Sequence, residues 1–208
     1  MKERPIIMTA DSVRAILDGR KTMTRRVIKP QPDNVARDDV PFIYTPKQVV
    51  TENGLETIDH IPGDPNKKFI KTIKCPYGIP GDRLWVREKW QAISLDGQWW
   101  HEVKEHRELY NWAWTNPVEP AYKETPPRWL PSIHMPRAAS RIALEVVNVR
   151  VEQVQDASYH DLEAEGMRGS IHDAMINYIS LWDTLNAKRG YPWTDNPWVW
   201  VIELKVLP

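Results

Sequence analysis

Cysteine is almost missing from this chain of 208 residues, since Cys75 is its only one. A single cysteine excludes an internal disulfide and a cysteine-based zinc site, and it fits a reducing compartment. No apolar run approaches the roughly 20 residues that a membrane-spanning helix needs, and the first residues of the chain contain no long apolar stretch. We therefore expect a cytoplasmic protein that does not bind a membrane.

Charge of one sign is not in excess either. Lys plus Arg and Asp plus Glu both total 28, which gives a formal net charge of zero. No overall field draws the protein toward nucleic acid or an anionic membrane, so any anion recognition must be local. Phenylalanine is scarce as well, with 2 Phe against 11 Trp. Tryptophan can fill a core or stack on a planar ring, and most of these residues are expected in the core.

Motifs for metals and cofactors are also lacking. The six histidines show no His-x-x-x-His spacing, and a zinc site needs three or four convergent ligands. The chain contains no phosphate-cradling glycine loop and no dinucleotide fingerprint, because Gly78 and Gly81 belong to a turn. We expect neither a bound metal nor a cofactor.

The chain does contain a dense polar motif, Gly-Arg-Lys-Thr-Met-Thr-Arg-Arg, at residues 19–26. Apolar residues at helical spacing from Val13 to Leu17 predict a short helix before it, which Gly19 ends. Residues 22–28 are then expected to form a strand with alternate side chains on opposite faces. A buried lysine amine beside a threonine hydroxyl can act as base and nucleophile. A solvated basic turn is the plain alternative.

Later segments predict further strands and helices. A tight turn leads into a strand at residues 83–88, and the longest strand signal covers residues 139–154, with a change of phase near Val146 that predicts a bulge. Residues 171–185 form an amphipathic helix whose apolar stripe is expected in the core. Residues 196–207 form a closing strand that must pair within the sheet.

A helix is also predicted at residues 157–165, with Asp156 as its N-cap and Gly166 as its terminator. Glu165 then lies in the last helical turn, where the helix field is unfavourable for an anion. A carboxylate in that position often has a partner or a functional role. Glu165 is therefore the acid of interest in this region.

This order of elements favours an α+β fold, with a small mixed β-barrel decorated by helices, in a single domain over residues 1–208. Long insertions are expected at about residues 31–70 and 91–128. The first is rich in proline and polar residues, with strand fragments at residues 42–44 and 48–51. The second is rich in tryptophan and predicts a long aromatic loop, either a lid or a surface excursion.

Several separated motifs resemble one family, the ASCH domain family, which has a PUA-like barrel. They keep the same order in this chain: Gly-Arg-Lys-Thr-x-Thr at residues 19–24, Pro-Gly-Asp at 80–82, Ala-Glu-Gly at 164–166, and Trp-Val-Trp-Val-Ile-Glu at 198–203. Residues 83–88, 132–137 and 196–200 further resemble the larger ASCH proteins encoded by bacterial phages and prophages. The resemblance covers most of the chain outside the two insertions.

Small bacterial ASCH proteins include an amidohydrolase that removes acetyl from N4-acetylcytidine with a lysine, a threonine and a glutamate. The resemblance implies that Lys21, Thr24 and Glu165 have these roles here, with Glu163 as the alternative acid. Neutral Lys21 would accept the Thr24 proton while Thr24 attacks the acyl carbonyl, and Glu165 would orient the amine or pass a proton to the leaving N4. Arg26 or a backbone N–H is expected to stabilise the oxyanion.

The implied substrate is a nucleoside with a modified cytosine, and Trp85 and Trp200 are the candidates for stacking on its base. A different class of function stays open. PUA-like barrels commonly bind RNA, and Arg20, Lys21, Arg25 and Arg26 could hold phosphates. The alternative predictions are therefore an RNA-binding module or a metal-independent ribonuclease.

Overall fold

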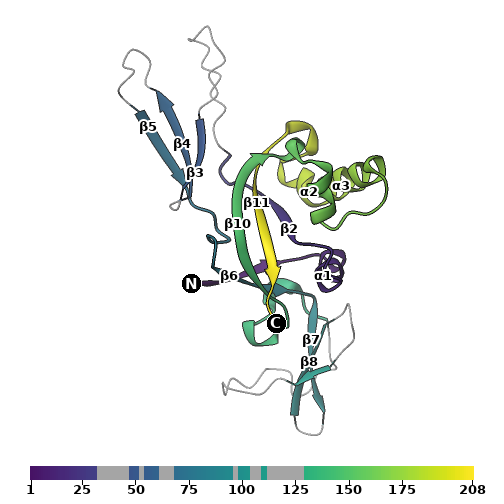
Figure 1. Cartoon of the computed structure of the whole chain (residues 1–208). Helices are drawn as coiled ribbons and strands as arrows, with labels where there is room; N and C mark the ends of the chain where they lie inside the picture. The colour runs from purple at the N-terminus through teal and green to yellow at the C-terminus, as the bar shows by residue number, and fades with distance from the viewer. Residues whose placement is uncertain (32–46, 52–53, 61–67, 96–97, 104–108, 112–128) are drawn as a thin grey trace.

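The computed structural model describes residues 1–31, 47–51, 54–60, 68–95, 98–103, 109–111 and 129–208. Five strands of this part form one mixed sheet in the order β1-β6-β10-β11-β2 (Figure 1). β1 and β6 run parallel, and the other neighbouring strands are antiparallel. The strands are β1 (Glu3–Ile7), β2 (Met23–Val27), β6 (Arg83–Arg87), β10 (Ala143–Gln153) and β11 (Trp198–Val206).

In the described part of the chain, three α-helices accompany the sheet: α1 (Ala10–Leu17), α2 (Tyr159–Ala164) and α3 (Ile171–Asn186). Figure 1 shows α2 and α3 together, near the edge of the sheet that β2 forms. Short 3-10 turns cover Ser132–His134, Arg137–Ala139, Val154–Asp156, Ala187–Arg189 and Trp193–Asp195. The predicted α+β class is confirmed. None of the described helices is long and apolar enough to cross a membrane.

The described strands do not close into the predicted barrel. β1 and β2 form the two edges of the five-stranded sheet, and no ladder joins them within the described residues. A side chain links the two edges instead, because an Arg26 guanidinium nitrogen donates to the Ile7 carbonyl oxygen at 2.9 Å. Within the described residues, the Arg26 side chain rather than strand pairing therefore connects β1 with β2.

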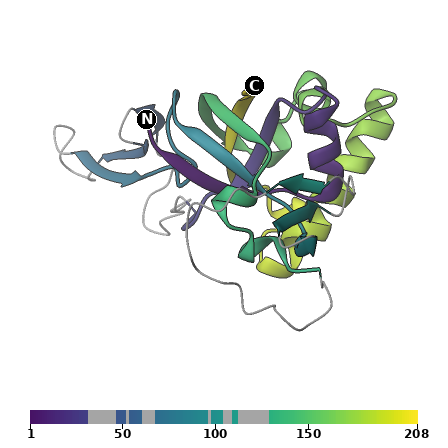
Figure 2. The ribbon, with the colours of Figure 1, turned by 90° about the horizontal axis from the view of Figure 1, so that it is seen from below.

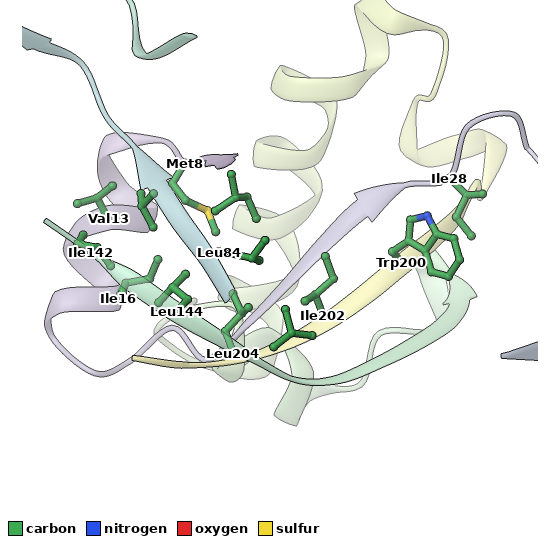
Figure 3. Packing of buried hydrophobic residues seen from close by; sticks show 13 residues of the cluster. Met8, Val13, Ile16, Ile28, Leu84, Ile142, Leu144, Trp200, Ile202 and Leu204 are labelled. Atoms are coloured by element: carbon green, nitrogen blue, oxygen red, sulfur yellow. The ribbon is translucent and has the colours of Figure 1, made fainter. Parts of the chain in front are cut away.

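β11 is buried on both faces, as its nearly continuous apolar sequence requires. Trp200 and Ile202 belong to a cluster that includes Val13 of α1 and Leu84 of β6 (Figure 3). Val199, together with Val201 on the same face, belongs to a second cluster with side chains of α2 and α3. The sheet thus separates two apolar cores, with α1 on one and the helix pair on the other.

The elements around residues 19–26 follow the sequence prediction. The Thr9 hydroxyl accepts from the Ser12 N–H at 3.2 Å, so Thr9 caps α1. Gly19 has a φ of +69°, a left-handed conformation that suits glycine after a helix end. The strand predicted at residues 22–28 is present as β2, and it pairs with the closing strand β11, which also pairs with β10.

The predicted bulge in the longest strand is confirmed. The β10–β11 register shifts between Val146 and Asn148. The extra residue changes which side chains face the core, so Val149 and Val151 pack against the same cluster as Leu144. The bulge therefore keeps the apolar residues of both halves of β10 on one core.

The cap predicted for α2 is wrong. Ser158, rather than Asp156, is the N-cap, and it forms a reciprocal capping box with Asp161. Asp156 instead accepts from the Gln153 N–H at 3.1 Å and closes the preceding 3-10 turn. Glu165 is the C-cap residue of α2. The amphipathic helix predicted at residues 171–185 is confirmed as α3.

The two insertions contain more strand than predicted. β3 (Lys47–Thr51), β4 (Gly54–His60) and β5 (Lys68–Ile73) form one antiparallel sheet, and β7 (Trp90–Leu95), β8 (Gln98–Val103) and β9 (Leu109–Asn111) form another. The first lies away from α2 and α3 in both Figures 1 and 2. The strand fragment at residues 48–51 is confirmed, and residues 42–44 lie outside the described part. The expectation of one long aromatic loop is wrong for β7–β9, because cross-strand pairing formed strands where local periodicity was weak.

Candidate active site

The turn before β2 is fastened to the end of α2, although the two are far apart in sequence. The Thr22 N–H donates to the Ala164 carbonyl at 2.8 Å, and the Arg20 guanidinium donates to the Gly166 carbonyl at 3.1 Å. The backbone N–H groups of residues 20 and 21 both donate to the carbonyl of Ala15 in α1. These bonds place Lys21 opposite Glu165.

Gly166 permits this close approach. Its φ is +92°, and a Cβ at this position would lie 3.0 Å from the Ala15 Cβ and 3.4 Å from the Lys21 Cβ. A side chain would therefore meet both α1 and the site lysine, in a backbone conformation that L residues disfavour. The glycine that ends α2 is thus also the residue that lets α2 contact the turn.

Lys21 and Glu165 form a buried ion pair at this junction. Lys21 Nζ lies 2.5 Å from Glu165 Oε2, and the two side chains are 4% and 6% exposed. The same amine donates to the Glu165 backbone carbonyl at 3.0 Å. The amine is therefore held in one place by two oxygens of a single residue.

The pKa of Lys21 is shifted downward. Burial disfavours the ammonium form and is the largest cause, while the Glu165 carboxylate opposes the shift. The nearby cations Arg26 and Arg25 add to the lowering. A lysine in this environment gives up its proton more readily than an exposed lysine, which is the property that a general base requires.

Arg25 is a second buried cation, and it holds the carboxylates around the pair. Its side chain is 1% exposed. Its Nε donates to Glu152 at 2.9 Å, and other guanidinium nitrogens lie 3.3 Å from Asp161 and 3.5 Å from Glu165. The second Glu165 oxygen thus faces Arg25 while the first faces Lys21. From the sequence, Arg25 was expected only as a phosphate contact in the RNA-binding alternative, not as a partner of these carboxylates.

A cavity of about 530 Å³ opens at this pair, within the size range of small-molecule sites. Thr24, Lys21 and Glu165 all line it. Its walls include residues of β1, β2 and α3, together with Tyr77, Arg87 of β6 and Ser12 of α1. The Thr24 side chain is buried within this wall. The predicted base, nucleophile and acid therefore share one cavity.

The remaining predicted site residues lie in different surroundings. Arg26 lines the cavity, but its guanidinium also donates to Ile7 O. Trp200 is buried in the core shared with α1, and Trp85 lies beneath the Arg87 guanidinium at 4.6 Å from its ring centre. Neither tryptophan belongs to the cavity lining.

The two acids considered from sequence are separated clearly. Glu165 binds Lys21, whereas the Glu163 side chain is 51% exposed and lies 3.8 Å from His160 Nδ1.

Tyr178 lines the cavity but was not predicted from the sequence as a site residue. In α3 it was assigned to the apolar stripe.

Among the described residues, no group of three or more His, Cys, Asp or Glu side chains is arranged to hold a metal ion. Comparisons of the chain with protein-family models, curated proteins and solved structures gave no match.

Proposed function

We propose that this protein is an amidohydrolase that removes an acyl group, such as acetyl, from an N4-acylated cytosine nucleoside. The observation that carries the proposal is the buried pair of Lys21 and Glu165 in a cavity that Thr24 also lines. An ion pair with a purely structural role is costly to bury, and apolar residues of similar size often serve as well. A lysine with a lowered pKa that shares its cavity with a buried threonine hydroxyl supports a catalytic role instead.

In the first step, Lys21 in its neutral form takes the hydroxyl proton of Thr24. The Thr24 oxygen forms a bond to the acyl carbonyl carbon, and the carbonyl oxygen becomes an oxyanion. When this intermediate collapses, the bond from carbon to N4 breaks, and the Lys21 ammonium returns its proton to the leaving nitrogen. Glu165 holds the amine in position through both protonation states.

In the second step, water attacks the acyl ester on Thr24. Lys21 accepts a proton from the water, the ester bond breaks, and the Thr24 oxygen takes that proton back. The products are the free cytosine nucleoside and the carboxylic acid, and no other reactant is needed. The ASCH resemblance supports the same reaction, and with it we propose membership of that family and a PUA-like arrangement of the strands.

The test is to incubate the purified protein with N4-acetylcytidine and to quantify cytidine and acetate. We expect turnover by the wild type, and a fall of about 10²-fold or more for Lys21→Met and Thr24→Val. Thr22→Val is the matched control, because Thr22 is exposed two residues away on the same segment. Glu163→Gln is the control for Glu165→Gln.

Circular dichroism of each variant shows whether it is folded. Full turnover by folded Lys21→Met or Thr24→Val would contradict the mechanism. Absence of turnover by the wild type on N4-acetyl, N4-propionyl and N4-benzoyl cytidine would contradict the substrate class.

RNA binding is a second candidate, favoured by the cations around the same cavity. Arg26, Lys29, Arg87 and Arg189 all contribute to its lining. Phosphate contacts release counterions, so affinity for a single-stranded RNA should fall steeply with salt, with a slope that decreases by about 0.7 for each contact removed. Fluorescence titration of an RNA oligonucleotide with wild type, Arg87→Gln and Arg189→Gln measures this slope. An affinity independent of salt would exclude RNA binding through phosphate contacts.

A further inference from the structure

Tyr178 is a buried residue of α3 whose hydroxyl lacks a hydrogen-bond partner. The side chain is 3% exposed, and its oxygen has no partner among the described residues. It lines the same cavity as Lys21, Thr24 and Glu165. A buried hydroxyl without a partner is unfavourable, so its retention at a cavity wall points to a ligand atom that completes the bond.

The ring of Tyr178 is held in place by two neighbours. Trp182 lies one helical turn along α3, with ring centres 6.5 Å apart, and Trp193 contacts the ring edge-on at 6.0 Å. Tyr178 also belongs to the apolar cluster between α3 and the sheet. The hydroxyl therefore has a fixed position at the cavity, as a preorganised donor requires.

The Tyr178 hydroxyl is protonated at neutral pH. Its pKa lies well above the ordinary value, mainly because burial disfavours the phenolate and also because the Glu165 carboxylate is near, while Arg25 opposes the shift. A neutral phenol can donate one hydrogen bond. The electrostatic surroundings thus favour a donor rather than an acid.

The two arginines of β2 near Glu165 already donate to other groups of the protein. Arg25 is shared among three carboxylates, and Arg26 donates to Ile7 O. Arg87 Nε is also a buried donor without a partner among the described residues, but its guanidinium lies over the Trp85 ring. Tyr178 has a donor without a partner among the described residues, and its hydroxyl lies within the field of Glu165 and Arg25.

We infer that the Tyr178 hydroxyl donates a hydrogen bond to the acyl carbonyl oxygen of the substrate and stabilises the oxyanion that forms when Thr24 attacks. The inference rests on the proposed amidohydrolase function and adds a catalytic residue to it. Because the bond strengthens as negative charge develops on that oxygen, it lowers the barrier more than it improves substrate binding.

The experiment compares wild type with Tyr178→Phe on N4-acetylcytidine. We expect kcat to fall by about 10²-fold, as for the loss of one oxyanion donor, with KM changed by less than about twofold. The ligand-free variant should melt at the wild-type temperature or above, because the mutation removes an unsatisfied group. Tyr159→Phe is the control, since the Tyr159 hydroxyl donates to the Gly169 carbonyl and does not line the cavity.

A second measurement uses N4-thioacetylcytidine, whose sulfur is a weaker acceptor than oxygen. The kcat for N4-acetylcytidine divided by the kcat for N4-thioacetylcytidine should be larger in wild type than in Tyr178→Phe. A purely structural tyrosine would not change this ratio. The role of Tyr178 is contradicted if Tyr178→Phe keeps the wild-type kcat, or if it melts at a lower temperature and leaves the substrate ratio unchanged. Neither result contradicts the proposed function. An inactive wild-type protein overturns the proposed function as well.

Discussion

Lys21 Nζ and Glu165 Oε2 lie 2.5 Å apart, although the two residues are 144 positions apart in the chain. Their contact depends on the backbone bonds that join the turn after α1 to the end of α2. Burying both charges is unfavourable by itself, and their attraction offsets that cost only while both partners are present. The pair therefore makes the site sensitive to substitution on either side.

Glu165→Leu should lower the free energy of unfolding by about 3–5 kcal/mol at pH 7, because it leaves Lys21 buried without its carboxylate. The pKa of Lys21 is already lowered in the folded protein, and removing the carboxylate lowers it further. The unfolded chain then binds more protons than the folded one between that pKa and the ordinary lysine value, so stability rises with pH in this window.

Urea unfolding of Glu165→Leu and wild type at pH 7 and pH 9.5 checks this expectation. The stability difference between the two proteins should shrink at the higher pH. A difference that grows with pH would show that the Lys21 amine is not the group left uncompensated. Glu163→Leu, at the exposed neighbour on α2, should change stability little at either pH.

The rate of deacylation should depend on pH through Lys21. The reaction needs the neutral amine, so kcat rises with pH through the lowered lysine pKa and levels off above it. The Glu165 carboxylate is the main group that raises this pKa. In Glu165→Gln the rising limb should therefore move to lower pH, even though the maximum rate falls because the amine is less well held.

A pH profile of kcat from pH 5 to 10 measures the position of the limb in both proteins. Glu163→Gln should reproduce the wild-type limb. A limb that moves to higher pH in Glu165→Gln would show that another group is titrating.

Local sequence signals predicted the parts of the fold that depend on neighbours in the chain. The helix before residue 19, strand β2 and the β10 bulge near Val146 all follow from periodicity and turn residues. The β7–β9 meander was missed because its strands are defined by pairs such as Ile93 with Trp100, which periodicity within one strand does not reveal.

The candidate site also combines residues that the local sequence predicts with residues that only the tertiary structure reveals. Lys21 and Thr24 stand out in one short motif, but the identity of their neighbours is set by tertiary packing. The alternation of β2 implied that Arg25 points away from Thr24, yet nothing local indicated that Glu152 and Asp161 would surround it. Tyr178 fitted the apolar stripe of α3 equally well as a core residue, and only the cavity distinguishes its hydroxyl.

Arg25→Met should destabilise the protein by about 3–5 kcal/mol, because it leaves the carboxylates of Glu152, Asp161 and Glu165 without the cation at their centre. Arg14→Met is the matched control. Arg14 pairs with Asp11 on the exposed face of α1, where an ion pair contributes at most about 1 kcal/mol. Urea unfolding of both variants gives the comparison, and equal losses would contradict a structural role for the buried cation.

Gly166→Ala should damage both stability and activity, and Gly190→Ala separates the two causes. Both glycines have a left-handed backbone, with φ values of +92° and +84°. An alanine at position 190 meets nothing within 4 Å, so it suffers only the conformational strain of about 1–2 kcal/mol. An alanine at 166 suffers the same strain and also contacts Ala15 and Lys21 too closely.

We expect Gly166→Ala to lose more stability than Gly190→Ala and to lose most of its turnover of N4-acetylcytidine, because the lysine is displaced from Glu165. Urea unfolding and product assays of the two variants measure this difference, and equal activity in both would show that the contact between α2 and the turn does not position Lys21.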